Sequence, residues 1–202
     1  MITVYKLFPG HLNLNGDSEN ADVLATRLKW AGIPHQLIEV VDEKGLQACN
    51  DALEQKPLGS IFVIGHGSKA ALKSLEQYSK QIKLLFARIL EQSIPAIVVG
   101  SGLTLIDRNS ATGQRSSRTY TLNLDIQGWP TQALGYVNSD TTDALVRVEQ
   151  NTILTHLHGP FLAKNHDWAT ELIRRAGSVL PESKETVLAK SHLVKIWEMS
   201  HD

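Results

Sequence analysis

The sequence predicts an α/β protein with a mostly parallel, doubly wound sheet flanked by helices. Three observations support this prediction. Short apolar runs typical of buried strands alternate with longer segments whose apolar residues recur at helical spacing. Glycine-containing turns end several of the apolar runs, as expected where a strand passes into a helix. Alternation of this kind favours parallel strands joined by helical crossovers.

The first hundred residues supply most of these elements. A strand is predicted at 2–8, followed by a loop rich in Asn, Gly and Asp at 13–20 and a helix at 21–31 that Gly32 ends. Further strands are predicted at 36–41, 60–65 and 95–99, and further helices at 46–55 and 72–92.

The second half of the chain changes character. Residues 107–151 are rich in Thr, Ser and Asn, which predicts short strands in a small antiparallel extension. A strand is predicted at 152–157, and helices at 168–176 and 184–199. The last helix should direct Leu188, Leu193 and Ile196 inward. We expect all 202 residues to form a single domain, 1–202.

Composition excludes several functional classes. Lys and Arg total 20 against 21 Asp and Glu, with no clustered basic run, which argues against binding of nucleic acid. No apolar stretch approaches the length of a membrane-spanning helix, and the N-terminus lacks the pattern of a signal peptide. The single cysteine, Cys49, excludes an internal disulfide. We therefore expect a cytoplasmic protein, and no motif calls for a cofactor.

Three glycine-containing breaks follow predicted strands: Gly65-His66-Gly67, Gly100-Ser101-Gly102 and His156-Leu157-His158-Gly159. Ligands of open parallel sheets bind beyond the carboxyl ends of the strands, so the three breaks are predicted to line one pocket. In many α/β enzymes a strand-to-helix elbow presents a nucleophile. The elbow at 95–104 instead has Gly100, which has no side chain.

Four segments carry a resemblance to a known family. They are Leu7-Phe8-Pro9 with the loop 13–20, the helix at 23–33, Gly135-Tyr136-Val137-Asn138, and Thr155-His156-Leu157-His158-Gly159-Pro160. Together they resemble class I glutamine amidotransferases of the CobB/CobQ-like group. Within that group the chain is most similar to the small, GatD-type subunit of lipid II isoglutaminyl synthase.

The resemblance implies a glutaminase site that has lost its nucleophile. Gly100 stands where the family has the attacking cysteine, and His158 stands where it has the histidine base. The resemblance further places Gly65, His66, Gly67, Ser101 and Asn138 at ligand-contacting positions. Thr104 replaces a family glutamine, Val137 replaces a glutamate, and the loop at 65–69 replaces one that helps to shape the oxyanion hole.

This resemblance predicts a glutamine amidotransferase-like subunit without cysteine-dependent glutaminase activity. Such a subunit would bind glutamine or a small carboxylate or amide. Its implied partner is a Mur-ligase-like amide ligase that acts in the amidation of cell-wall precursors.

Two other functions stay open. One is an active amidohydrolase that uses His158 with Ser101 or with a metal, since His156, His158 and His66 are ligand types that metals accept. The other is a stand-alone ligand-sensing or interaction module.

Several residues also have purely structural interpretations. His158 could bond a backbone carbonyl, Asp17 and Asn20 could cap their loop, and Ser68 could cap a helix. Arg174 and Arg175 are interpreted as a solvated pair near a helix end, and Trp168 as a core residue.

Overall fold

The computed structural model describes residues 1–55, 58–108 and 111–199. Its centre is a six-stranded sheet with the strand order β2-β1-β3-β4-β8-β7. The strands are β1 (Ile2–Leu7), β2 (His35–Val40), β3 (Ser60–Ile64), β4 (Ala96–Val99), β7 (Val146–Glu149) and β8 (Thr152–Thr155). All neighbouring strands are parallel except β7, which runs antiparallel to β8. The predicted fold class is confirmed.

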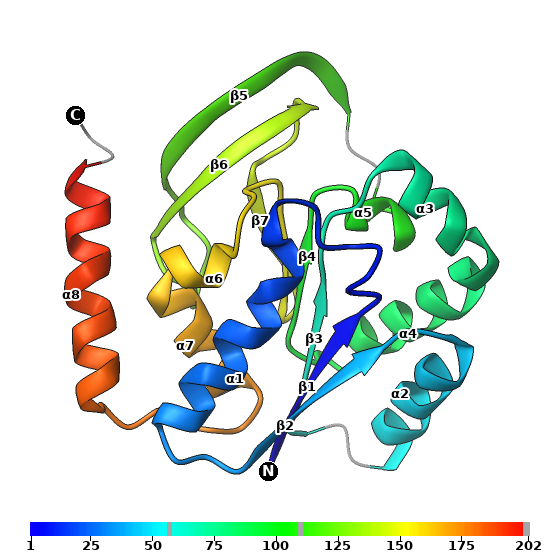
Figure 1. The fold of residues 1–202 in the computed structure, drawn as a ribbon, viewed down its shortest axis with the longest axis horizontal. Helices are drawn as coiled ribbons and strands as arrows, with labels where there is room; N and C mark the ends of the chain where they lie inside the picture. The colour runs from blue at the N-terminus through cyan, green and yellow to red at the C-terminus, as the bar shows by residue number, and fades with distance from the viewer. Residues whose placement is uncertain (56–57, 109–110, 200–202) are drawn as a thin grey trace.

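Helices cover both faces of this sheet because the central strands are apolar on both sides (Figure 1). Alternate residues of one strand enter different cores: Val4 of β1 packs with α1 (Asn20–Trp30) and α7 (His166–Arg175). Its neighbour Tyr5 packs with α2 (Glu43–Gln55) and α4 (Ser79–Glu91). Trp168 of α7 lies in the first core and is 1% exposed, which confirms the prediction for it.

Shorter helical segments connect these elements. They are the 3₁₀ segments η1 (Leu14–Glu19) and η2 (Glu76–Tyr78) and the helices α3 (Lys69–Leu75), α5 (Gly102–Leu105) and α6 (Phe161–Lys164). The Ser68 side chain accepts a hydrogen bond from the Ala71 N–H and caps α3, as predicted.

The prediction of one helix at 72–92 is wrong, because α3, η2 and α4 occupy this stretch in succession. At their junction the Ser74 hydroxyl donates to the Ala71 carbonyl and the Gln77 amide donates to the Ser74 carbonyl. Side chains that bond nearby backbone groups in this way compete with continuous helix.

The strand predicted at 152–157 is also too long. It ends at Thr155, whose hydroxyl accepts the Leu157 N–H and donates to the Leu145 carbonyl. These two hydrogen bonds turn the chain out of the sheet just before His158.

The antiparallel extension is confirmed, but it is a ribbon of two long strands, β5 (Thr112–Asn123) and β6 (Gln132–Thr141), rather than several short ones. The ribbon arches over the edge where the parallel strands end (Figure 1). β7, which falls within the residues expected to form the extension, instead joins the main sheet.

The last helix, α8 (Lys184–Met199), has the predicted bounds, but the prediction of its inward face is confirmed only for Leu193 and is wrong for Leu188 and Ile196. Leu188 is 58% exposed and Ile196 is 47% exposed. The face toward the body consists of Leu193 together with Thr186, Ala189 and Trp197, which recur at helical spacing and are buried or half-buried.

Candidate functional site

The three predicted strand-end breaks do meet, because β3, β4 and β8 are neighbours in the sheet. They border a cavity of about 410 Å³ under the β5–β6 ribbon. His66, Gly67, Gly100, Ser101, Asn138 and His158 all line this cavity. Gly65 lies beneath it: a Cβ there would come within 1.9 Å of the Leu12 carbonyl oxygen, so the position is packed against the chain rather than open.

The elbow after β4 is closed where a side chain would emerge. Gly100 has φ +54°, a left-handed conformation that glycine adopts at little cost. A Cβ built on it would lie 2.6 Å from Nδ1 of His66 and 2.7 Å from Cε1 of His158. Two imidazole rings therefore occupy the space that a nucleophile would need.

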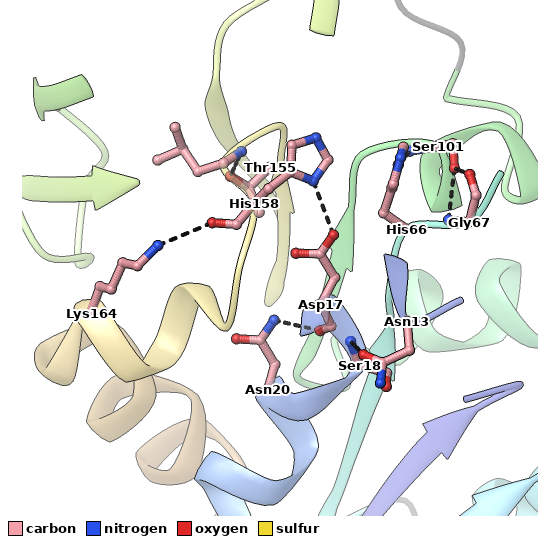
Figure 2. Close-up of polar contacts among 11 residues, drawn as sticks. Asn13, Asp17, Ser18, Asn20, His66, Gly67, Ser101, Thr155, His158 and Lys164 are labelled. Atoms are coloured by element: carbon pink, nitrogen blue, oxygen red, sulfur yellow. Dashed lines mark hydrogen bonds and ion pairs between the residues drawn. The ribbon is translucent and has the colours of Figure 1, made fainter. Parts of the chain in front are cut away.

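His158 pairs with a carboxylate from the opposite end of the sequence. Its Nδ1 lies 3.0 Å from Oδ2 of Asp17, and both side chains are buried (Figure 2). Donation from Nδ1–H to the carboxylate leaves the lone pair of the ring on Nε2, which is the arrangement of a histidine held as a base.

The loop after β1 holds Asp17 in place. The Ser18 N–H donates to Oδ1 of Asn13, and the Asn20 side-chain amide donates to the Asp17 carbonyl. Burial raises the pKa of the Asp17 carboxyl, and the hydrogen bond from His158 opposes this shift.

The interpretation of Asp17 as a loop cap was wrong. The sequence feature that could have indicated the role of Asp17 at the site is its position in the loop at 13–20, one of the segments that carry the family resemblance. Asn20 does act locally, and its Oδ1 also accepts the Leu162 N–H.

Ser101 is directed away from His158. Its hydroxyl donates to the Gly67 carbonyl at 2.7 Å and accepts the Gly67 N–H at 3.1 Å (Figure 2). The Ser101 N–H donates to Nδ1 of His66 at 2.9 Å. The N–H groups of Gly67 and Ser101 are thus already engaged, although an oxyanion hole needs such groups directed at the substrate.

These contacts also fix the proton on His66. Because Nδ1 accepts from Ser101, the hydrogen of the neutral ring is on Nε2. The rings of His66 and His158 meet edge to face with centroids 4.6 Å apart. Burial, with nearby His158 and His156, lowers the pKa of His66 to about 4. Burial, with nearby His158, likewise lowers the pKa of His156 to about 4.

The outer wall of the cavity is mainly cationic. Lys69, Arg108 and Arg115 line it, against one carboxylate, Asp140. Arg108 is engaged by Glu149, with N–O distances of 2.8–3.1 Å. Nε and Nη2 of Arg115 both donate to Oδ1 of Asn138, which orients the guanidinium without neutralising it.

Neither metal chemistry nor chemistry at the single cysteine gains support from the described residues. Among the described residues, no group of three or more His, Cys, Asp or Glu side chains is placed to hold a metal ion. Cys49 is buried in α2, away from the residues that line the cavity, and burial raises the pKa of its thiol to about 12.

Comparison with known proteins defines the fold. No family model matches the chain, and no curated protein matches it. A glutamine amidotransferase from Thermotoga maritima superposes with a TM-score of 0.51 and 12% identity, over 100% of this chain and 99% of that one. A protein from Bacteroides thetaiotaomicron described as a protease I matches with a TM-score of 0.44 and 13% identity, over 86% of this chain and 97% of that one.

The chain therefore has a class I glutamine amidotransferase-like α/β fold. Within its described part, none of the helices combines the length and apolar character that crossing a bilayer requires.

Proposed function

We propose that this protein binds a small molecule carrying a carboxamide or carboxylate in the cavity at Gly100 and does not hydrolyse it by a cysteine route. The observation that carries the proposal is the closed elbow. Gly100 offers no nucleophile, and the imidazoles of His66 and His158 fill the space in front of it.

The engaged backbone amides support the same conclusion. A thioester route needs donors aimed at the developing oxyanion, and loss of one donor costs about 10²–10³ in rate. Here the Gly67 N–H donates to the Ser101 hydroxyl, and the Ser101 N–H donates to Nδ1 of His66.

The cavity nevertheless offers a recognition surface. His66 offers a ring N–H and His158 offers a ring lone pair, and a primary carboxamide can satisfy one of each. Lys69 and Arg115 supply positive charge for a carboxylate on the same ligand.

Two measurements on the purified protein test this function. Ammonia release should show no turnover of L-glutamine, and calorimetric titration with L-glutamine and L-glutamate should detect binding of at least one. Arg115→Gln should weaken that binding about tenfold or more. Arg118→Gln is the matched control, since Arg118 is on β5 with Arg115 but does not line this cavity.

Glutamine turnover that is lost in His158→Ala would refute the proposal. A titration in which neither L-glutamine nor L-glutamate binds would also refute it. Turnover would favour the second candidate, a hydrolase with a nucleophile other than cysteine. The buried Asp17–His158 pair favours that candidate, because it orients an imidazole as a base. An electrophilic glutamine analogue would then label Ser101.

A Mur-ligase-like partner in cell-wall precursor amidation, and a cytoplasmic location, complete the proposal. The partner is supported by the sequence resemblance of the loop at 13–20 and of the segment at 155–160, and the location by the single cysteine, which fits a reducing compartment. Affinity capture of the tagged chain from its own cells should recover an amide ligase of that type. Recovery of the chain without such a ligase would favour a stand-alone sensing module.

A further inference from the structure

A second cavity, which we call the tryptophan cavity, lies between α8 and the start of α7. Its volume is about 760 Å³, within the range of about 300–1,000 Å³ that is usual for small-molecule sites. Its walls come from residues 129–132, from residues 164–168 and from α8, which stands beside α6 and α7 (Figure 1). Among the described residues, none lines both this cavity and the one at Gly100.

Indole rings form much of the wall. Trp129, Trp168 and Trp197 all line the cavity, and the rings of Trp129 and Trp168 stack with centroids 5.4 Å apart. The indole N–H of Trp168 donates to the Gln132 carbonyl, and that of Trp197 donates to the Lys164 carbonyl. Because these two donors are engaged, the two indoles offer ring surface to a ligand. Ring surface favours a planar aromatic molecule.

His166, the first residue of α7, supplies a polar group that the protein leaves unpaired. Its side chain lines the cavity and is 8% exposed, and its Nε2 is buried without a hydrogen bond to the described chain. Its Nδ1 faces two oxygens, Oδ1 of Asp167 at 3.4 Å and Oγ1 of Thr170 at 3.3 Å. The Thr170 hydroxyl gives its own hydrogen to the His166 carbonyl, and a carboxylate only accepts, so Nδ1 carries the ring proton. Burial lowers the pKa of His166, so the ring is neutral at pH 7 and Nε2 holds a lone pair.

The neighbouring Asn165 has no comparable capacity left. Its amide group donates to the carbonyls of Leu134 and Phe161, and its Oδ1 accepts the Leu134 N–H. The lone pair of His166 is therefore the buried acceptor that a ligand could satisfy. A buried acceptor without a partner is unfavourable, so an N–H or O–H on the ligand would gain from meeting it.

The charged residues of the lining balance one another. Lys164 and Lys190 stand against Asp167 and Glu198. A wall with equal numbers of both signs gives no net advantage to an anion or to a cation. The ligand that fits it best is uncharged.

We propose that the tryptophan cavity is a second binding site, for an uncharged planar aromatic molecule that donates a hydrogen bond to Nε2 of His166. The aromatic body lies against the indole rings, and the single hydrogen bond sets its orientation. This site goes beyond the function proposed for the cavity at Gly100, because it uses none of the residues that line that cavity.

Two probes of the same shape test the hydrogen bond. Indole has a ring N–H, and benzofuran has an oxygen in its place, which can only accept. In NMR titrations of the full chain, indole should bind with a dissociation constant of about 1 mM or tighter. Benzofuran should bind about tenfold more weakly, because it leaves Nε2 of His166 unpaired.

The same titrations locate the probe without any substitution. The indole N–H signals of Trp168 and Trp197 should shift when the probe binds. The signal of Trp30 should not, since Trp30 is on α1 and does not line the cavity.

His166→Phe keeps a ring in the wall but removes the acceptor. In this variant indole and benzofuran should bind equally well within error, and binding of benzofuran shows that the variant is folded with its cavity intact. His192→Phe is the matched control, since His192 is exposed on α8 and does not line the cavity. It should retain the preference for indole.

Four results would overturn the proposal. They are a wild type that does not bind indole at about 5 mM, equal binding of the two probes to the wild type, a preference for indole that persists in His166→Phe, and shifts at Trp30 without shifts at Trp168 and Trp197.

Discussion

Position 100 shows how one residue determines the chemistry of this site. The left-handed backbone of Gly100 and the two imidazoles in front of it leave no space for even a β-carbon. The chain thus differs from a glutaminase by more than a missing sulfur atom, since His66 is held by Ser101 and His158 by Asp17.

Gly100→Cys is therefore expected to give no glutaminase activity and to destabilise the fold. The positive φ and the displaced imidazoles together should lower the free energy of unfolding by about 3 kcal/mol. Denaturant unfolding and an ammonia-release assay measure the two effects.

Gly32→Ala is the control for backbone strain alone. Gly32 also has positive φ, at +66°, but a β-carbon added there would meet nothing within 4 Å beyond its chain neighbours. Gly100→Ala should cost clearly more than Gly32→Ala. Equal costs, or glutamine turnover by the cysteine variant, would show that the imidazoles move aside easily.

At the scale of elements, α7 shows that neighbouring residues with the same charge can have different roles. Arg174 is exposed and pairs with Glu171 one turn away. Arg175 also bonds Glu171, but it reaches the Gly128 carbonyl and the Asn151 side chain as well, and its guanidinium lies 4.2 Å from the Trp129 ring centroid. The prediction of a solvated pair is correct for Arg174 and wrong for Arg175.

Arg175→Ala should accordingly lower the free energy of unfolding by about 2 kcal/mol, through lost hydrogen bonds and lost stacking on Trp129. Arg174→Ala, the matched neighbour, should leave the unfolding midpoint unchanged within error. Thermal and urea unfolding of both variants test this contrast, and similar midpoints for the two would contradict it.

At the scale of the whole molecule, the two cores share the strands of one sheet, so we expect them to unfold together and ionisation at the site to contribute to global stability. His66 and His156 have pKa values near 4 in the folded protein, below the usual 6.5 of a histidine. The unfolded chain therefore binds more protons between these values, and stability that is fully present above pH 6.5 is lost as the pH falls toward 4.

His66→Asn should reduce this loss, because asparagine does not titrate and its side-chain oxygen can still accept the Ser101 N–H. The slope of unfolding free energy against pH between about 4 and 6.5 should be shallower than in the wild type. His11→Asn, at an exposed position, is the control. The raised pKa of Asp17 acts in the opposite direction in both proteins and cancels in the comparison. An unchanged slope in His66→Asn would contradict the assignment.

The sequence by itself determined the alternation of strands and helices in the first hundred residues, the doubly wound class, and the meeting of three strand-end breaks at one cavity. These features follow from local periodicity and from the rule that parallel strands end at a common edge, so no contact between distant residues is needed to predict them.

Only the tertiary structure decided that Asp17 orients His158, that two imidazoles fill the space at Gly100, and that α8 turns Leu193 and Trp197, but not Leu188, toward the body. Each of these depends on which side chains meet after folding. Such meetings join residues up to 141 positions apart, as for Asp17 and His158, and periodicity along the chain carries no information about them.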